Sequence, residues 1–103
     1  QLLADAHAVE EAGAFSVVLE MVPATAAAQV TKELRIPTIG VGAGPDVDGQ
    51  LMVLTDWAGF ATGRIPKFVK QYANLSGVLT DAVGAYRADV ASGAYPASEH
   101  NYE

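Results

Sequence analysis

Two hydrophobic runs stand out in the first half of the chain. Residues 15–22 read FSVVLEMV and residues 36–44 read IPTIGVGAG, and their one charged residue is Glu20. Runs this rich in β-branched and aliphatic residues, without polar alternation, are typical of strands buried on both faces of a parallel sheet. We therefore predict one strand in each run, the second of them ending in glycines.

Helical periodicity surrounds these runs. A first amphipathic helix is predicted over residues 2–12, with Gly13 as its C-terminal stop. A second is predicted from Pro23, which suits a first helical turn, to about Leu34. The order helix, strand, helix, strand indicates a βαβ unit of an α/β protein. The expected inner faces of the two helices are Leu2, Leu3, Ala6 and Val9, and Ala26, Ala27, Val30 and Leu34.

The second half of the chain is less regular. Residues 45–50 are rich in Asp, Gly and Pro and predict a turn, and residues 51–57 favour a third strand over a short helix. A further helix is predicted to open at Pro66, with Phe68, Val69, Tyr72 and Leu75 on one side. A last helix, capped by Ser76 and ended by Gly93, precedes a polar, aromatic tail.

Three strands are too few for a closed barrel, and three parallel strands leave two open edges. The first residues, QLLADAHAVEEAG, have the pattern of a helix that starts without the usual signals of a chain's beginning. We therefore expect further strands to come from an upstream part of the same protein or from another chain.

Composition narrows the class of protein. Half of the 103 residues are hydrophobic and 17% are charged, which is typical of a chain that forms a core. The net charge of −6, with six basic residues, argues against nucleic-acid binding. Cysteine is absent, which excludes thiol catalysis. No apolar run approaches the roughly 20 residues of a membrane helix, and we expect a cytoplasmic protein.

Glu20 is the first candidate for chemistry. In parallel α/β proteins, residues at the carboxyl ends of strands face the ligand crevice, and Glu20 stands at such an end. We expect its apolar neighbours to desolvate it, and desolvation raises a carboxyl pKa toward values useful for proton transfer. The alternative is a structural carboxylate that caps the following helix.

The other candidate motifs are less specific. GVGAG at residues 40–44 lacks the spacing of a dinucleotide fingerprint and fits better as the floor of a pocket. DVDG at residues 46–49 lacks the remaining ligands of a calcium loop and is interpreted as a solvated turn. His7 and the pair Lys67 and Lys70 are interpreted as surface residues, and the role of His100 cannot be read from spacing.

At this point the chain resembles a known family. The segments LLADAHAVEEAGAFSVVLEMVP, IPTIGVGAGPDVDGQLMVLTDWAGF, PKFVKQYA and SGAYPASEHNYE together resemble the C-terminal part of ketopantoate hydroxymethyltransferase. That resemblance implies a (β/α)₈ TIM barrel domain, with residues 1–103 supplying its sixth to eighth strands and a C-terminal helical extension. The barrel strands before these would be missing from the chain.

The same resemblance implies an activity. Members of this family transfer a hydroxymethyl group from 5,10-methylenetetrahydrofolate to 3-methyl-2-oxobutanoate, giving 2-dehydropantoate in pantothenate biosynthesis, with Mg²⁺ bound to the 2-oxo acid. Their proton acceptor lies in the VLE-x-VP block, which places it at Glu20, and a looser carry-over places Val41 and Gly42 in the substrate pocket. The metal ligands fall in the earlier strands, outside this chain. A homo-oligomer, commonly a decamer in bacteria, is implied as well.

Two other hypotheses stay open on the sequence. One is another Mg²⁺-dependent, enolate-forming barrel of the phosphoenolpyruvate mutase or isocitrate lyase type, against which GVGAG, DGQ and the tail from Pro96 to His100 argue. The other is a non-enzymatic assembly fragment, against which the open strand edges argue.

Overall fold

The computed structural model describes all 103 residues and divides them into two compact units. The first unit comprises residues 1–53 and 66–69, and the second comprises residues 54–65 and 70–103.

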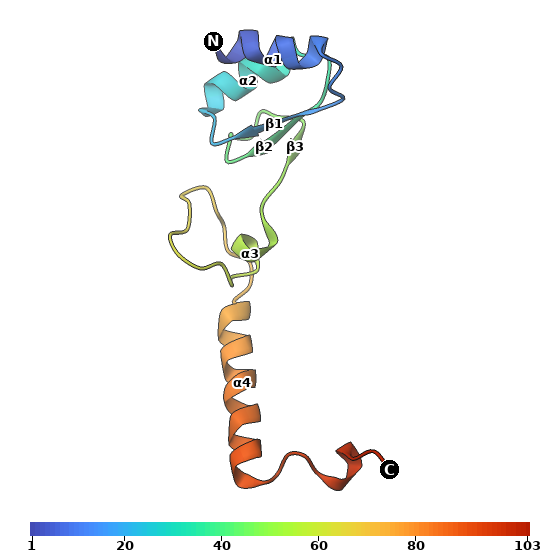
Figure 1. Cartoon of the computed structure of the whole chain (residues 1–103). Helices are drawn as coiled ribbons and strands as arrows, with labels where there is room; N and C mark the ends of the chain where they lie inside the picture. The colour runs from blue at the N-terminus through green and yellow to red at the C-terminus, as the bar shows by residue number, and fades with distance from the viewer. The chain divides into compact units, whose positions relative to one another are not determined.

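The first unit is a small α/β structure with a parallel sheet (Figure 1). Its elements are α1 (Leu2–Glu11), β1 (Val17–Glu20), α2 (Ala24–Glu33), β2 (Thr38–Val41) and β3 (Gly49–Gln50), and the strand order is β1-β2-β3. The register runs from Val17 opposite Thr38 to Glu20 opposite Val41. The predicted α/β class and the order of the first four elements are thus confirmed.

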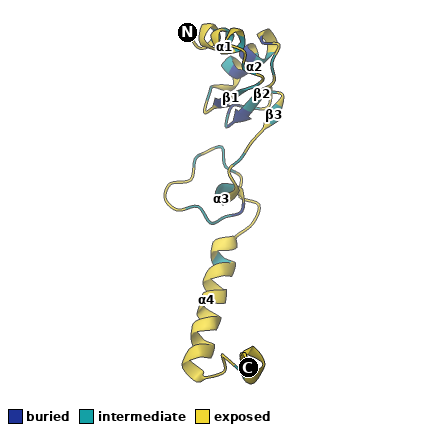
Figure 2. Ribbon diagram, turned by 45° about the vertical axis from the view of Figure 1, so that its right-hand side comes forward, coloured by how far each residue is buried: buried dark blue, intermediate teal, exposed yellow.

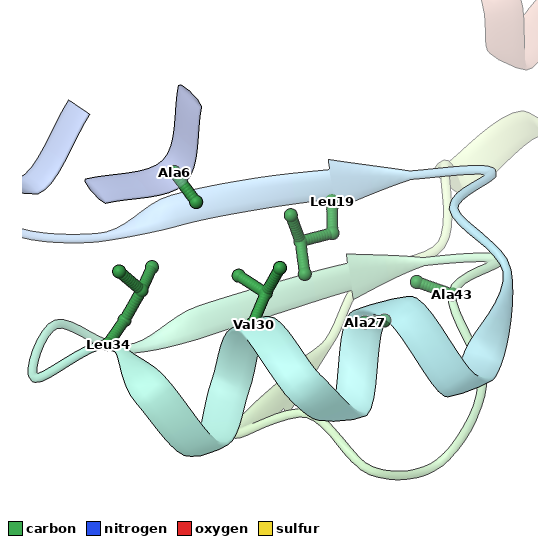
Figure 3. Packing of buried hydrophobic residues seen from close by; sticks show 6 residues of the cluster. All are labelled: Ala6, Leu19, Ala27, Val30, Leu34 and Ala43. Atoms are coloured by element: carbon green, nitrogen blue, oxygen red, sulfur yellow. The ribbon is translucent and has the colours of Figure 1, made fainter. Parts of the chain in front are cut away.

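The core of this unit lies between the sheet and its two helices. Leu19 of β1 is 4% exposed and packs against small and branched residues of α1 and α2 (Figure 3). On the other side of β1, Val18 is 56% exposed. Because side chains alternate along a strand, α1 and α2 cover one face of the sheet, and the other face, on which Val18 lies, carries no helix of this unit. The core cluster consists of Ala6, Leu19, Ala27, Val30, Leu34 and Ala43.

A polar network anchors the amino end of β2. Thr38 is fully buried, and both its N–H and its hydroxyl donate to Asp48 Oδ2, at 2.8 and 3.1 Å. The Thr38 hydroxyl also lies 2.7 Å from that of Thr31, which donates to the carbonyl of Ala27 in α2. Asp48 therefore fixes the first residue of β2 through these hydrogen bonds. This role agrees with the interpretation of DVDG as a turn and not as a calcium loop.

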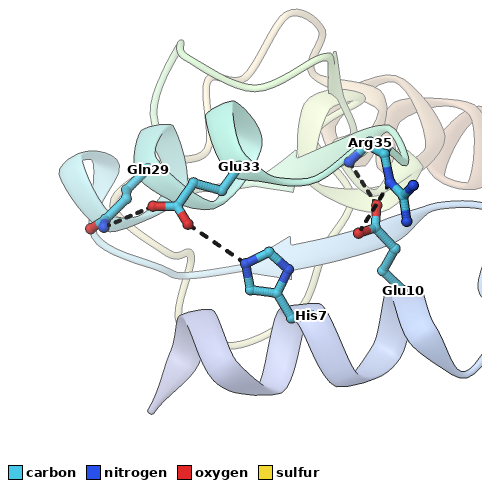
Figure 4. Close-up of polar contacts among 5 residues, drawn as sticks. All are labelled: His7, Glu10, Gln29, Glu33 and Arg35. Carbon is cyan, nitrogen blue, oxygen red and sulfur yellow. Dashed lines mark hydrogen bonds and ion pairs between the residues drawn. The ribbon is translucent and has the colours of Figure 1, made fainter.

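Glu10 holds the segment that leads into β2 (Figure 4). Its Oε1 accepts from the N–H groups of Arg35 at 2.6 Å and Ile36 at 3.1 Å, and its side chain is only 10% exposed. The Arg35 N–H, together with that of Ile36 and the Arg35 guanidinium, keeps the pKa of Glu10 below its ordinary value, although partial burial acts in the opposite direction. His7, predicted to be a surface residue, is 41% exposed and lies 3.6 Å from a carboxylate oxygen of Glu33.

The prediction of a third strand over residues 51–57 is wrong. The strand that pairs with β2 is Gly49–Gln50, and the N–H of Leu51 donates to the Gly40 carbonyl before the pairing ends. Residues Leu54–Trp57 form the short helix α3, whose carbonyls bind the N–H groups that follow. The pairing of β2 with β3 explains this difference, because it involves Gly49 and Gln50, which precede the apolar run at residues 51–57.

The helix predicted to open at Pro66 is also absent. Residues 66–69 form a single turn, closed by the Val69 N–H and the Pro66 carbonyl at 3.1 Å. The N–H of Tyr72 donates to the carbonyl of Trp57 at 2.8 Å, and that of Leu75 donates to the carbonyl of Ala58 at 2.9 Å. These donors serve the end of α3, so they are not available for a continuous helix.

The second unit continues into the long helix α4 (Leu75–Ser92) and the short 3₁₀ helix η1 (Ser98–His100). The cap of α4 is Asn74, whose side chain accepts from the Gly77 N–H at 3.2 Å, and not Ser76 as predicted. Gly93 ends α4 in the left-handed conformation, as predicted. Figure 2 shows that α4 is exposed along almost its whole length.

The tail folds locally after α4. The rings of Tyr86 and Tyr95 meet edge to face at 5.4 Å, and the His100 ring lies 5.0 Å from that of Tyr95. Nδ1 of His100 accepts from the N–H of Ala97 at 3.0 Å. No helix in the chain combines the length and the apolar character that crossing a membrane requires.

Replacing Glu10 by Gln should lower the free energy of unfolding at neutral pH. Since the folded-state pKa of Glu10 is lowered, its ionised form adds stability above the ordinary carboxyl pKa of about 4.3, and this is lost as the pH falls through the folded value. The difference in the free energy of unfolding between the wild type and Glu10→Gln should therefore become smaller at acidic pH. Urea unfolding across this pH range measures it.

Two controls separate the causes. Glu11→Gln changes the exposed neighbouring carboxylate and should leave the pH profile nearly unchanged. Arg35→Met removes the guanidinium, which is 89% exposed, but keeps the backbone donor, so it should have a smaller effect than Glu10→Gln. An equal pH profile for wild type and Glu10→Gln would show that the backbone bonds add no pH-dependent stability.

Candidate functional site

A pocket of about 560 Å³ lies at the carboxyl ends of β1 and β2. Its walls come from the turn after β1, the start of α2, the glycine segment after β2 and the turn at residues 66–69. All of these belong to the first unit. The lining residues are Met21, Val22, Pro23, Ala24, Gly42, Gly44, Lys67 and Phe68. This is the edge at which parallel α/β sheets place their ligands.

Met21 turns the chain sharply at the end of β1. Its φ of +53° lies in the left-handed region, which non-glycine residues rarely adopt, and its N–H donates to the Val41 carbonyl at 2.8 Å. The strand alternation breaks here. Met21 is 67% exposed and lines the pocket, whereas Val22 contacts both the pocket and the helical core. Simple alternation along the strand would direct Met21 toward the helices and Val22 to the side of Glu20, and the left-handed turn at Met21 reverses both directions.

Glu20 lies on the sheet face that the helices leave uncovered. Its predecessor Leu19 points into the helical core, so the alternation along β1 directs Glu20 to the opposite side. The side chain is exposed, and the desolvation that we predicted from its apolar neighbours is not found within this chain. The helix α2 begins after Pro23 without a side-chain cap, which gives the capping alternative no support.

Gly42 shapes the floor of the pocket. Its φ is +66°, and a Cβ at this position would overlap the ring of Phe68. Gly42 lines the pocket, whereas Val41 is 6% exposed and is not among the lining residues. Val41 is the register partner of Glu20, so the two residues stand side by side at the ends of β1 and β2.

Lys67 and Phe68 are pocket residues that the sequence did not reveal as such. Periodicity suggested a helix with Lys67 on its solvated face and Phe68 on its inner face, but the turn at residues 66–69 places both in the pocket wall. One signal was present. Three of the six basic residues of this acidic chain fall within residues 64–70, next to a glycine-punctuated loop.

The acidic residues of the chain do not form a metal centre. No group of three or more His, Asp or Glu side chains lies close enough together to hold a metal ion. Asp48, the nearest approach to a ligand motif in the sequence, is bonded to Thr38 instead. The residues present therefore do not fit a complete Mg²⁺ site.

Comparison with known proteins decides the family. The sequence profile described as ketopantoate hydroxymethyltransferase matches residues 1–98. The chain belongs to the ketopantoate hydroxymethyltransferase family.

Several relatives share more than half of their aligned residues with it. The 3-methyl-2-oxobutanoate hydroxymethyltransferase of Leifsonia xyli is 69% identical over 102 residues, which cover 99% of this chain and 37% of the relative. The protein of the same name from Streptomyces coelicolor is 60% identical over 101 residues, covering 98% and 35%. That from Corynebacterium jeikeium is 61% identical, covering 97% and 36%.

The chain thus spans about a third of the length of these ketopantoate hydroxymethyltransferase relatives. Within that third, the match includes every element of the first unit, α4 and the pocket. Membership of this family supports the first of the three hypotheses drawn from the sequence. The α/β structure with parallel strands is consistent with part of a TIM barrel.

Substituting Gly42 by Ala should destabilise the first unit by about 1–3 kcal/mol, through the positive φ and through overlap with the Phe68 ring. Gly13→Ala is the matched control, because Gly13 belongs to the same unit and also has a positive φ (+94°) but has open space around the added methyl group. Urea unfolding of both variants measures the difference. Equal costs at the two glycines would contradict the close contact with Phe68, and adding Phe68→Ala to Gly42→Ala should recover part of the loss.

Proposed function

We propose that a protein containing this chain transfers a hydroxymethyl group from 5,10-methylenetetrahydrofolate to 3-methyl-2-oxobutanoate, giving 2-dehydropantoate. The observation that carries the proposal is the combination of family membership with a carboxylate at the carboxyl end of a parallel strand. In this reaction C3 of the 2-oxo acid loses a proton and forms a carbon–carbon bond to the one-carbon unit of the folate. Both carbon–nitrogen bonds of that unit break, water supplies the hydroxyl oxygen of the product, and tetrahydrofolate leaves. The pathway served is pantothenate biosynthesis.

Glu20 is the proposed proton acceptor. Its position supports this role in two ways, since it lies on the face away from the helical core and directly before the pocket residue Met21. As an exposed carboxylate within this chain, it is accessible to a substrate placed against the uncovered sheet face. Closure of that face by further strands would enclose the substrate beside Glu20 and exclude water from the proton transfer.

The proposed architecture is a (β/α)₈ barrel in which β1, β2 and β3 are the sixth, seventh and eighth strands. Two observations support this arrangement: the strands pair in parallel, and the helices pack on a single face of the sheet. In a TIM barrel the helices lie outside the strands, and the strands direct their other side chains into the barrel. In such a barrel Val18, Glu20 and Val41 would face the interior. We propose that the enzyme assembles as a homo-oligomer, as the apolar residues exposed on α4 suggest.

The proposed enzyme depends on Mg²⁺, with its ligands outside these 103 residues. This part of the proposal rests on the family resemblance, which assigns the metal ligands to earlier barrel strands. When bound, the ion would make C3 of the 2-oxo acid more acidic. Val41 and Gly42 remain proposed neighbours of the substrate, Gly42 as a lining residue of the pocket and Val41 as the register partner of Glu20.

Glu20→Gln in the complete enzyme should keep the fold and lower turnover by roughly 10²–10⁴-fold, the usual contribution of general acid–base catalysis. Gln has nearly the size of Glu but cannot accept the C3 proton. Initial rates of 2-dehydropantoate formation measure the effect, and the KM for 3-methyl-2-oxobutanoate should change much less. Glu11→Gln, a carboxylate exchange on α1, is the control and should leave turnover unchanged. Near-normal turnover by Glu20→Gln would remove Glu20 from the mechanism.

The 103-residue chain by itself should not catalyse the reaction. It carries one candidate proton acceptor and no set of residues for a metal ion, whose charge stabilisation contributes several kcal/mol in reactions of this kind. The assay combines the purified chain with both substrates and Mg²⁺, next to the full-length Leifsonia xyli relative as the positive control. Turnover by the chain alone would show that the site is complete within it.

A further inference from the structure

The pocket beside Glu20 combines an apolar wall with a single cation. Met21, Val22, Pro23 and Ala24 line it, and so does Phe68, whose ring lies over Gly42. Lys67 is the one charged residue among the eight that line it. A pocket of this kind fits a ligand that has a flat apolar body and an anionic end.

The size of the pocket helps to decide between the two proposed substrates. Its volume of about 560 Å³ falls within the range of about 300–1,000 Å³ that is usual for drug-sized ligands. The short branched 2-oxo acid is far smaller than such a ligand. A reduced folate has the right size, with a bicyclic ring, an aminobenzoyl ring and a terminal glutamate.

The chemistry of the lining fits the folate as well. The thioether of Met21 and the ring of Phe68 are the side chains that pack well against aromatic rings. The Lys67 ammonium can pair with a glutamate carboxylate, and α2 begins at the pocket wall, where the helix dipole also favours an anion. Met21 follows Glu20 directly, so a folate held here lies next to the proposed site of proton removal.

We infer that the pocket formed by Met21, Phe68 and Lys67 binds the folate cosubstrate, with Lys67 pairing its glutamate carboxylate. This inference rests on the proposed hydroxymethyl transfer for the identity of the folate. Lys67 is thus a binding residue for the one-carbon donor and takes no part in the removal of the C3 proton. Glu20 would then act on the 2-oxo acid, and Lys67 would bind the folate.

The test uses Lys67→Met in a full-length protein that carries this sequence. We expect the KM for 5,10-methylenetetrahydrofolate to rise about tenfold, with kcat and the KM for 3-methyl-2-oxobutanoate nearly unchanged. Lys67→Arg should restore most of the affinity. The control is Lys32→Met, which removes an exposed cation from the last turn of α2 and should change neither KM.

Two further measurements separate this inference from the proposed function. Deuterium uptake at C3 of 3-methyl-2-oxobutanoate, measured in D₂O without folate, reports the Glu20 step and should be equal in wild type and Lys67→Met. Calorimetric binding of tetrahydrofolate reports the pocket directly, without turnover, and should weaken about tenfold in Lys67→Met.

The outcomes are distinct. A wild type with neither exchange nor turnover would refute the proposed function, while tetrahydrofolate binding that depends on Lys67 would still support the pocket. An unchanged affinity of Lys67→Met for tetrahydrofolate would overturn the inference. If Lys67→Met instead raised the KM for 3-methyl-2-oxobutanoate, the pocket would belong to the 2-oxo acid, and the inference would likewise be overturned.

Discussion

The parallel register of β1 and β2 is the constraint on which the rest of this structure depends. It pairs Glu20 with Val41, so both strands end at the same level, and the hydrogen bond from the Met21 N–H to the Val41 carbonyl closes the pairing. Leu19 in the helical core then determines the face of every other residue in β1. A slip of one residue would turn Glu20 into the core and Leu19 out of it.

The two ends of β2 use their polar groups differently. At its amino end, Glu10 binds the N–H groups of Arg35 and Ile36, and Asp48 binds Thr38. These carboxylates bind backbone donors on both sides of the entry to β2, one of which belongs to the fully buried Thr38. At the carboxyl end of the sheet, by contrast, no carboxylate binds the backbone. Glycines form the segment after β2, Gln50 donates to the Gly44 carbonyl at 2.8 Å, and Glu20 is exposed. The carboxylates that hold the strands therefore lie at the amino edge, and the carboxylate at the carboxyl edge is free of backbone contacts.

Local signals in the sequence predicted the first unit and the end of α4 well. The βαβ order, Gly13 after α1 and Gly93 after α4 all depend on residues close together along the chain. The failures have non-local causes. The third strand ends before its apolar run because pairing with Ile39 and Gly40 fixes it at Gly49–Gln50, and the expected helix at Pro66 loses its donors to α3.

In the candidate site, too, features with local causes could be predicted and features with non-local causes could not. Glu20 could be found because a carboxylate at the end of an apolar run is unusual and because the surrounding block resembles a family. The conformation of Met21 could not be found, since a positive φ at a residue other than glycine leaves no mark in the sequence. Phe68 and Lys67 enter the pocket only because Gly42 leaves room for the ring. Contacts made across 26 residues of separation, such as that of Phe68 with Gly42, need the folded chain to become visible.

Two apolar surfaces of the chain have different physical requirements for cover. The uncovered sheet face carries Val18 beside an open edge of β1, and such an edge offers backbone donors and acceptors to a further strand. On α4, by contrast, Val78, Val83 and Tyr86 are all more than half exposed, and a helix has no free backbone edge. Its apolar residues can be covered only by side-chain packing, as between helices. A barrel would satisfy the first requirement and an assembly of barrels the second, so the proposed architecture accounts for both surfaces with separate contacts.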